Sequence, residues 1–162
     1  MPPYRLQALL DMRSKAKEEA EQAFSAAIKV LEKEKVEQQR LEAELERRKR
    51  ERKARVTEYL QQVMAKGAGI NGMNLMNRFE ERLKDEEAQV ALQIDHQKEV
   101  VKAAERAVEQ RRYVMAEAAK ELKAIEKNKE TWQKQVRAER QQREELTQEE
   151  IGNALFLARQ RK

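Results

Sequence analysis

Proline and glycine, the two residues that most often interrupt helices, are confined to a few places in this chain. The only prolines are Pro2 and Pro3, and the stretches 4–66 and 73–151 contain neither residue type. Two helices of unusual length are therefore possible. Charged residues make up 40% of the chain and aromatic residues 4%, which leaves too little bulky apolar material for a layered globular core. The sequence favours an all-α protein.

An apolar stripe with alternating steps of three and four residues runs through the second half. Eleven of its fifteen positions from Glu87 to Val136 are apolar. A repeat of 3.5 residues kept over this length is typical of a left-handed coiled coil, because an ordinary amphipathic helix drifts away from it. A weaker copy with a polar middle runs from Ala20 to Val63. The two stripes predict two helices that pack along a common line, here called the seam.

The segment between the two stripes has the composition of a turn. It carries Gly67, Gly69 and Gly72, and Asn74 is a plausible N-cap of the following helix. We therefore predict a long two-helix antiparallel coiled-coil hairpin over residues 1–146, with its turn at 65–74. Residues whose numbers sum to about 139 should then lie opposite each other. This register pairs Leu45 with Ile94, Val56 with Leu83, and Arg52 with Glu87.

The C-terminal residues predict a separate element. Thr147 to Glu150 has the pattern of a capping box, which marks the start of a helix. A short C-terminal helix or tail is therefore expected over 147–162. Its apolar residues, which include Leu155 and Phe156, have no partner in the predicted hairpin. We expect them to fold back or to bind another protein.

Enzymatic and cofactor-dependent functions are disfavoured. The glycines of the turn match a dinucleotide-binding pattern, but that pattern needs a preceding strand, and an amphipathic helix precedes it here. His96 is the only histidine and lies off the seam. A two-helix rod also offers no enclosed pocket in which the pKa of a carboxyl could be shifted for catalysis. We expect no catalytic, cofactor-binding or metal-binding residues.

The charge pattern bears on nucleic acids and membranes. Residues 46–55 hold seven basic and two acidic side chains, which taken alone would suit a nucleic acid. The predicted register lays them beside acidic residues between Glu80 and Glu87, so internal neutralisation is favoured and nucleic-acid binding is a third-ranked alternative. No apolar run reaches the roughly 20 residues of a membrane span, and we expect a cytoplasmic protein without membrane insertion.

The opening residues Tyr4 to Arg13, followed by a helix rich in alanine and glutamate, resemble the start of the FliJ/YscO (SctO) family. The hairpin and the segment from Trp132 to Glu145 extend the resemblance over nearly the whole chain. Members of this family are central-stalk proteins of flagellar and type III secretion export ATPases. The resemblance implies a non-enzymatic, monomeric two-helix coiled coil at the cytoplasmic side of the inner-membrane export apparatus.

The resemblance also implies partners. The end where the termini pair would enter the hexameric secretion ATPase, with Leu6 beside Trp132. Phe79 and Leu83 occupy the place of an aromatic and a leucine that contact the export-gate membrane protein in flagellar members, and Met76 extends the same face. Phe79 and Leu83 could equally be seam residues. Export chaperones are further expected partners. The C-terminal extension favours the injectisome branch; the alternatives are a flagellar counterpart and a purely structural coiled-coil scaffold.

Overall fold

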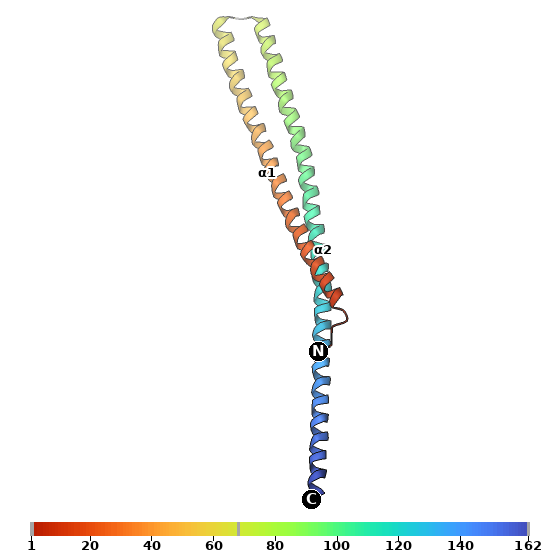
Figure 1. The fold of residues 1–162 in the computed structure, drawn as a ribbon. Helices are drawn as coiled ribbons and strands as arrows, with labels where there is room; N and C mark the ends of the chain where they lie inside the picture. Colours follow the sequence, from red (N-terminus) through yellow and green to blue (C-terminus); the bar gives the residue numbers. More distant parts are fainter. Residues whose placement is uncertain (1, 68, 162) are drawn as a thin grey trace. The chain divides into compact units, whose positions relative to one another are not determined.

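The computed structural model describes residues 2–67 and 69–161. Within these residues it contains no strand and two long helices, α1 (Gln7–Lys66), of 60 residues, and α2 (Ile70–Gln160), of 91 residues. The helices follow each other with three residues between them and pack against each other in opposite directions (Figure 1). The predicted all-α architecture of two long antiparallel helices is confirmed.

The chain divides into two compact units, each containing parts of both helices. The turn unit comprises Ala23–Arg112 and includes the turn. The terminal unit comprises Met1–Gln22 and Tyr113–Lys162, and so includes both ends of the chain.

Glycine shapes the turn. The backbone of Gly67 has a φ of 65°, in the left-handed region that glycine adopts without strain, and it ends α1 directly after Lys66. The carbonyl of Gly69 accepts a hydrogen bond from the N–H of Gly72 at 3.0 Å, which begins the first turn of α2 at Ile70. Only three residues separate the two helices.

The turn is therefore shorter than the predicted 65–74. Asn74, expected as the N-cap of the second helix, lies inside α2. Contacts in the turn unit include Glu34 with Gln97 and Arg52 with Glu87, whose numbers sum to 131 and 139. The predicted Arg52–Glu87 pair is confirmed and has the predicted sum of 139, whereas the Glu34–Gln97 contact lies below it.

The core of the turn unit is a thin line of apolar side chains. Leu41, Val90 and Ile94 form its central cluster, and Leu45 packs against them. Further buried residues of this unit are Val63, Met76, Glu87, Gln97, Val101 and Ala104. No large side chain among the described residues is fully enclosed, since only two helices shield the seam. Stability therefore depends on many small contributions along the seam.

Two polar contacts interrupt this apolar line. The side-chain amide of Gln97 donates hydrogen bonds to the backbone carbonyl of Glu34 at 2.9 Å and to its carboxylate at 2.6 Å. The Nε of Arg52 donates to both carboxylate oxygens of Glu87. Buried polar groups need such partners, and apolar residues cannot supply them. These contacts favour one pairing of the helices over shifted alternatives.

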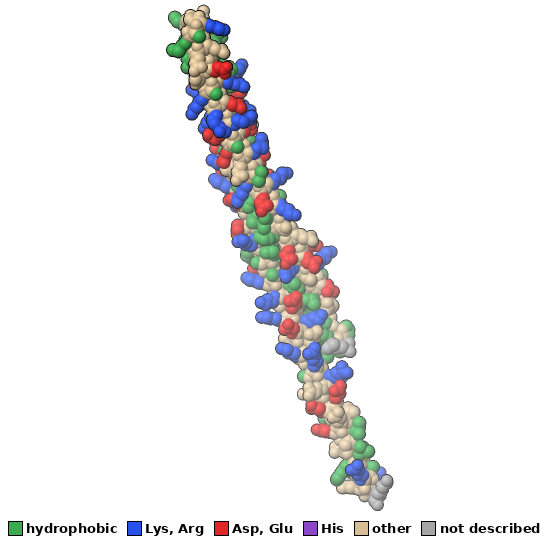
Figure 2. Space-filling view, turned by 90° about the vertical axis from the view of Figure 1, so that its left-hand side faces the viewer, with side chains coloured by type: hydrophobic (Ala, Val, Ile, Leu, Met, Phe, Trp, Pro, Cys, Tyr) green, Lys and Arg blue, Asp and Glu red, His purple; other side chains and the backbone are tan. Residues whose placement is uncertain are grey.

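Ion pairs between neighbouring turns of the same helix lie along the charged outer surface. Arg40, for example, donates hydrogen bonds to both carboxylate oxygens of Glu37, at 2.7 and 2.9 Å, and these bonds lower the pKa of that carboxyl. Figure 2 shows basic and acidic side chains interspersed along the visible face. Such exposed pairs are worth little individually, but they suit a helix that is solvated on most of its circumference.

The N-terminal part of α1 packs on α2 in the terminal unit. Ala20, Leu122 and Ile125 are its buried apolar residues. The guanidinium of Arg13 donates a hydrogen bond to the backbone carbonyl of Glu121 at 3.1 Å. These contacts continue the two-helix packing within this unit.

The predicted separate C-terminal helix is wrong. α2 continues without a break to Gln160, and the Thr147 hydroxyl donates to the carbonyl of Arg143 at 2.8 Å instead of capping a new helix. The surrounding residues are strong helix formers, so the capping-box pattern does not suffice to break the helix. Residues 137–161 are all exposed. The division of the chain into domains 1–146 and 147–162 stays a prediction.

Candidate partner-binding surfaces

The turn end carries apolar side chains that the hairpin does not bury. They are Met64, Ile70, Met73 and Leu75, which are 82%, 80%, 42% and 59% exposed, and they are here called the tip residues. Apolar side chains also gather at the upper end of the view in Figure 2. Exposed apolar clusters on a heavily charged protein mark sites of interaction. The sequence analysis did not select these residues, although four apolar residues beside the turn glycines and off the seam were a usable signal.

The predicted gate contacts follow the tip residues along α2. Met76 is buried at 6% exposure, whereas Phe79 and Leu83 are half-buried. The guanidinium carbon of Arg82 lies 5.3 Å from the centroid of the Phe79 ring, in cation–π geometry. Met76 therefore belongs chiefly to the seam, while Phe79 and Leu83 keep accessible surface. A role for these three residues in partner binding stays a prediction.

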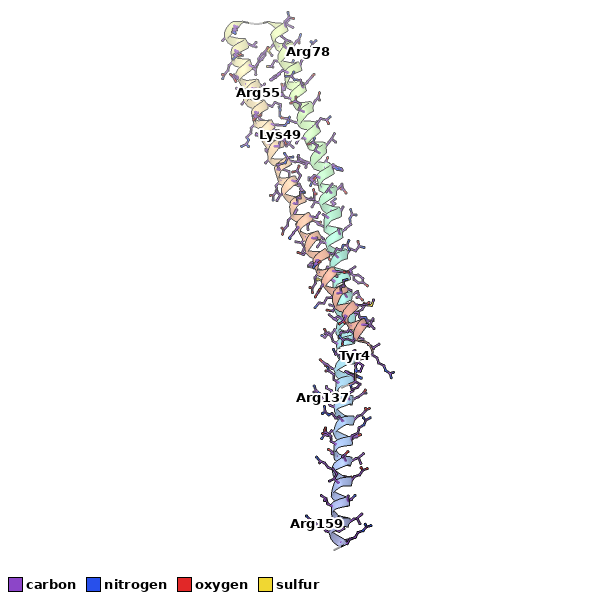
Figure 3. All side chains as sticks on the ribbon, viewed as in Figure 1. Tyr4, Lys49, Arg55, Arg78, Arg137 and Arg159 are labelled. Carbon is purple, nitrogen blue, oxygen red and sulfur yellow. The ribbon has the colours of Figure 1, made fainter. Side chains whose placement is uncertain are left out.

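A groove lies where the N-terminus meets α2 in the terminal unit. The rings of Tyr4 and Trp132 lie 5.0 Å apart between centroids. The Tyr4 hydroxyl donates a hydrogen bond to the side-chain carbonyl of Asn128, and the Lys129 ammonium lies 5.9 Å from the Tyr4 ring. Figure 3 labels Tyr4. Leu6 is 40% exposed and lines the same groove as Trp132.

The structure thus brings the predicted pair Leu6 and Trp132 into one groove, but the aromatic partner of Trp132 is Tyr4. This contact was not predicted, because Tyr4 precedes α1 and its position does not follow from a helical register. A role for Leu6 and Trp132 in binding the ATPase stays a prediction.

The last turns of α2 carry exposed apolar residues. Leu155 and Phe156 are 60% and 61% exposed, and Leu146, Ile151 and Leu157 are comparably exposed. Leu155 and Ile151 lie on one face of the helix, since residues four apart are neighbours, whereas Phe156 points about 100° away from Leu155. The predicted binding residues therefore occupy two faces. Their role stays a prediction.

Arginine and glutamate side chains form ion pairs near the turn end of α1. The Arg48 guanidinium lies 3.1 Å from the Glu44 carboxylate and 3.5 Å from that of Glu86. Arg52 pairs with Glu87 at 2.9 Å and with Glu80 at 3.6 Å. Two cations of the basic run are thus neutralised within the turn unit, in agreement with the predicted internal pairing. Lys49 and Arg55 of the same run are shown in Figure 3.

The acidic residues near the turn end serve chiefly as ion-pair partners. Glu80 and Glu87, from the predicted acidic stretch, both serve as ion-pair partners of Arg52. Within the described residues no cluster of three or more histidine, cysteine, aspartate or glutamate side chains could hold a metal ion. The described part of the chain also contains no helix long and apolar enough to span a membrane. The surfaces described above are suited to protein contacts.

Comparison with known proteins identifies the family. The family model for YscO-like proteins matches residues 1–162. The chain belongs to the YscO-like family. YscO-like proteins are structural, non-enzymatic components of type III secretion, so this chain is a type III secretion-related protein. The family predicted from Tyr4 to Arg13 and the hairpin is therefore confirmed.

A solved structure has the same fold. The chain is similar to CT670 of Chlamydia trachomatis, a proposed YscO homolog, with a TM-score of 0.81 and 22% sequence identity. The match covers 100% of this chain and 99% of the other. A comparison with curated proteins finds no match. The YscO-like hairpin of two long helices is thus shared at low sequence identity.

Proposed function

We propose that this YscO-like protein is the non-enzymatic central stalk of a type III secretion export apparatus. In this role it binds the hexameric secretion ATPase through its terminal unit and the export-gate membrane protein through its turn end. The observation that supports the proposal is the placement of exposed apolar residues, which cluster beside the turn and again beyond residue 145 of α2. Two such clusters on a charged coiled coil suit a protein that links two partners.

The contact with the ATPase would use the groove residues Leu6 and Trp132 and the exposed residues Leu155 and Phe156. The Tyr4 ring packs against Trp132 at a tilt of 46°, and its hydroxyl donates to Asn128, so Tyr4 is held on α2 at this point. A rigid helix with apolar side chains along its length can insert into a groove or pore of a partner. The terminal unit offers such a helix in the last turns of α2, where Leu146, Ile151 and Leu155 are exposed.

The contact with the export gate would use Phe79 and Leu83, with Met76 completing the face. The tip residues adjoin this face and enlarge the apolar surface that a partner could cover. On this proposal the protein works on the cytoplasmic side of the inner membrane, peripheral to the export apparatus. Export chaperones are additional proposed partners.

Co-purification with the hexameric ATPase of the same secretion system tests the stalk role. We expect a complex with the ATPase and faster ATP hydrolysis when the chain is added. The matched control is a Leu92→Ala/Val36→Ala variant, because Leu92 and Val36 are exposed at 62% and 64% but lie outside the proposed surfaces. Absence of both binding and stimulation would favour the purely structural scaffold. Stronger binding to a flagellar export ATPase than to an injectisome one would favour the flagellar counterpart.

A further inference from the structure

A small hollow in the turn unit is lined mainly by arginine. We call it the arginine hollow; its lining residues are Arg47, Arg48, Glu51, Arg52 and Arg55 of α1 and Leu83 and Glu86 of α2. All seven residues belong to the turn unit. Four arginine residues thus line one hollow together with Leu83, one of the residues proposed to contact the export gate.

The four arginines differ in how far they are already neutralised. Arg48 and Arg52 are engaged across the seam by glutamates, as described above. Among the described residues Arg47 pairs only with Glu51, at 3.8 Å, and both side chains are more than half exposed. Arg55 is exposed, and none of the ion pairs formed by the described residues includes it. Exposed pairs contribute little, so Arg47 can exchange its partner at small cost.

We propose that the arginine hollow is the docking site for an acidic segment of the export-gate protein, an inference that rests on the proposed function. Carboxylates of that segment bind Arg47 and Arg55 at the rim, while an apolar side chain packs on Leu83. Arginine suits this role, because its planar group forms two parallel hydrogen bonds with a carboxylate. The gate contact then combines an apolar anchor with charge complementarity, which adds specificity and speeds association.

A protein segment fits the hollow better than a nucleic acid does. Glu51 and Glu86 line the same hollow, so a phosphate backbone, which carries a charge at every nucleotide, would place charges beside them, whereas a peptide can space its carboxylates to meet only the arginines. No aromatic side chain lines it, so bases have no surface on which to stack. An acidic peptide can place its carboxylates on the arginines and keep apolar groups on Leu83.

The test uses the full chain and the purified soluble domain of the export-gate protein from the same secretion system. Arg47→Glu/Arg55→Glu should weaken binding at least tenfold and reduce its dependence on salt. The matched control is Arg106→Glu/Arg112→Glu, which changes the net charge equally. Arg112 forms an exposed pair with Glu109 at 3.6 Å, much as Arg47 does with Glu51. We expect the control to bind within about twofold of the unchanged chain, and both variants to melt alike, because all four arginines are exposed.

The binding results for these variants distinguish the acidic-segment site from its alternatives. If Phe79→Ala/Leu83→Ala abolishes binding but the Arg47/Arg55 reversal does not, the gate surface stands and the acidic segment is overturned. If the unchanged chain does not bind the gate domain, the proposed function fails, and poly-L-glutamate becomes the probe. If poly-L-glutamate binds the unchanged chain but not the Arg47→Glu/Arg55→Glu variant, the hollow is an acidic-peptide site for another protein. Equal binding of poly-L-glutamate to the unchanged chain and to the variant would overturn the site. The site would also be overturned if the unchanged chain bound duplex DNA more tightly than poly-L-glutamate and the Arg47→Glu/Arg55→Glu variant lost that DNA binding.

Discussion

Arg52 and Glu87 are joined across the seam by two hydrogen bonds, from one guanidinium nitrogen to both carboxylate oxygens, at 2.9 and 3.1 Å. Glu87 is 8% exposed, so its charge depends on this partner. Arg52 also lies 3.6 Å from Glu80. One arginine therefore compensates two carboxylates of α2.

Removing Arg52 should destabilise the hairpin. We expect Arg52→Met to lower the free energy of unfolding by about 2 kcal/mol, because a largely buried carboxylate then loses its charged partner. Arg52→Met/Glu87→Met should recover most of this loss, since the buried charge of Glu87 is removed together with its partner. Urea unfolding measures both. Equal stability of the two variants would show that Glu87 does not depend on Arg52.

The apolar cluster around Leu41 gives a second stability test. Leu41→Ala should lower the free energy of unfolding by about 2 to 3 kcal/mol, because Leu41 packs against Val90 and Ile94 in the centre of the turn unit. Leu92→Ala serves as the control, since Leu92 is 62% exposed, and should change it by less than about 0.5 kcal/mol. Comparable losses in the two variants would contradict the assignment of the core.

The architecture was readable from the sequence because its determinants are local and periodic. The breaker-free stretches and the 3.5-residue repeat predicted two long helices, and the opposite charges of Arg52 and Glu87 identified a cross-helix pair. The exact turn was not readable, because asparagine favours the N-cap and Asn74 therefore pointed to a later start, whereas α2 begins at Ile70. Only the left-handed backbone at Gly67 decides where α1 ends.

The binding surfaces were predicted less well. A seam can be read from periodicity, but exposure depends on whether the other helix reaches the residue. Phe79 and Leu83 were therefore ambiguous, and the structure leaves them half-buried. Met64 and Ile70 were overlooked because residues off the seam carry no periodic signal. The error at Thr147 is of another kind, since a capping pattern competes with helix continuation and the continuous helix prevails there.

The groove at the N-terminus leads to a third prediction. Trp132→Ala should free the N-terminus, because Tyr4 loses the ring on which it packs. Trp132 is half-buried, so we expect a local loss of about 2 kcal/mol, below that of a fully buried tryptophan. Amide exchange should accelerate near residues 7–13 and remain unchanged around Leu41. Weaker stimulation of the ATPase should accompany the change.

A double-mutant cycle isolates the aromatic contact itself. Comparing Tyr4→Ala, Trp132→Ala and the double variant should give a coupling of about 0.5 to 1.5 kcal/mol, the range found for aromatic pairs. A coupling near zero would mean that Asn128 and Lys129, rather than the ring contact, hold Tyr4 in place.

The exposed end of α2 gives the final prediction, which separates binding from folding. Leu155 and Phe156 are 60% and 61% exposed on a helix without a packing partner in the described structure, so their side chains contribute little to stability. Alanine is also the stronger helix former, which offsets any loss. We therefore expect Leu155→Ala/Phe156→Ala to leave the melting temperature unchanged within about 2 °C. If these residues contact the ATPase, its binding should weaken at least tenfold, because large apolar side chains dominate the energy of such interfaces.

Single substitutions resolve the two faces of this helix. Leu155 shares its face with Ile151, whereas Phe156 does not, so a partner that covers only one face should respond to Leu155→Ala or to Phe156→Ala alone. An ATPase pore that surrounds the helix should respond to both. Unchanged ATPase binding in the double variant, at unchanged melting temperature, would remove this part of α2 from the proposed contact and leave the groove at Leu6 and Trp132 as the remaining candidate.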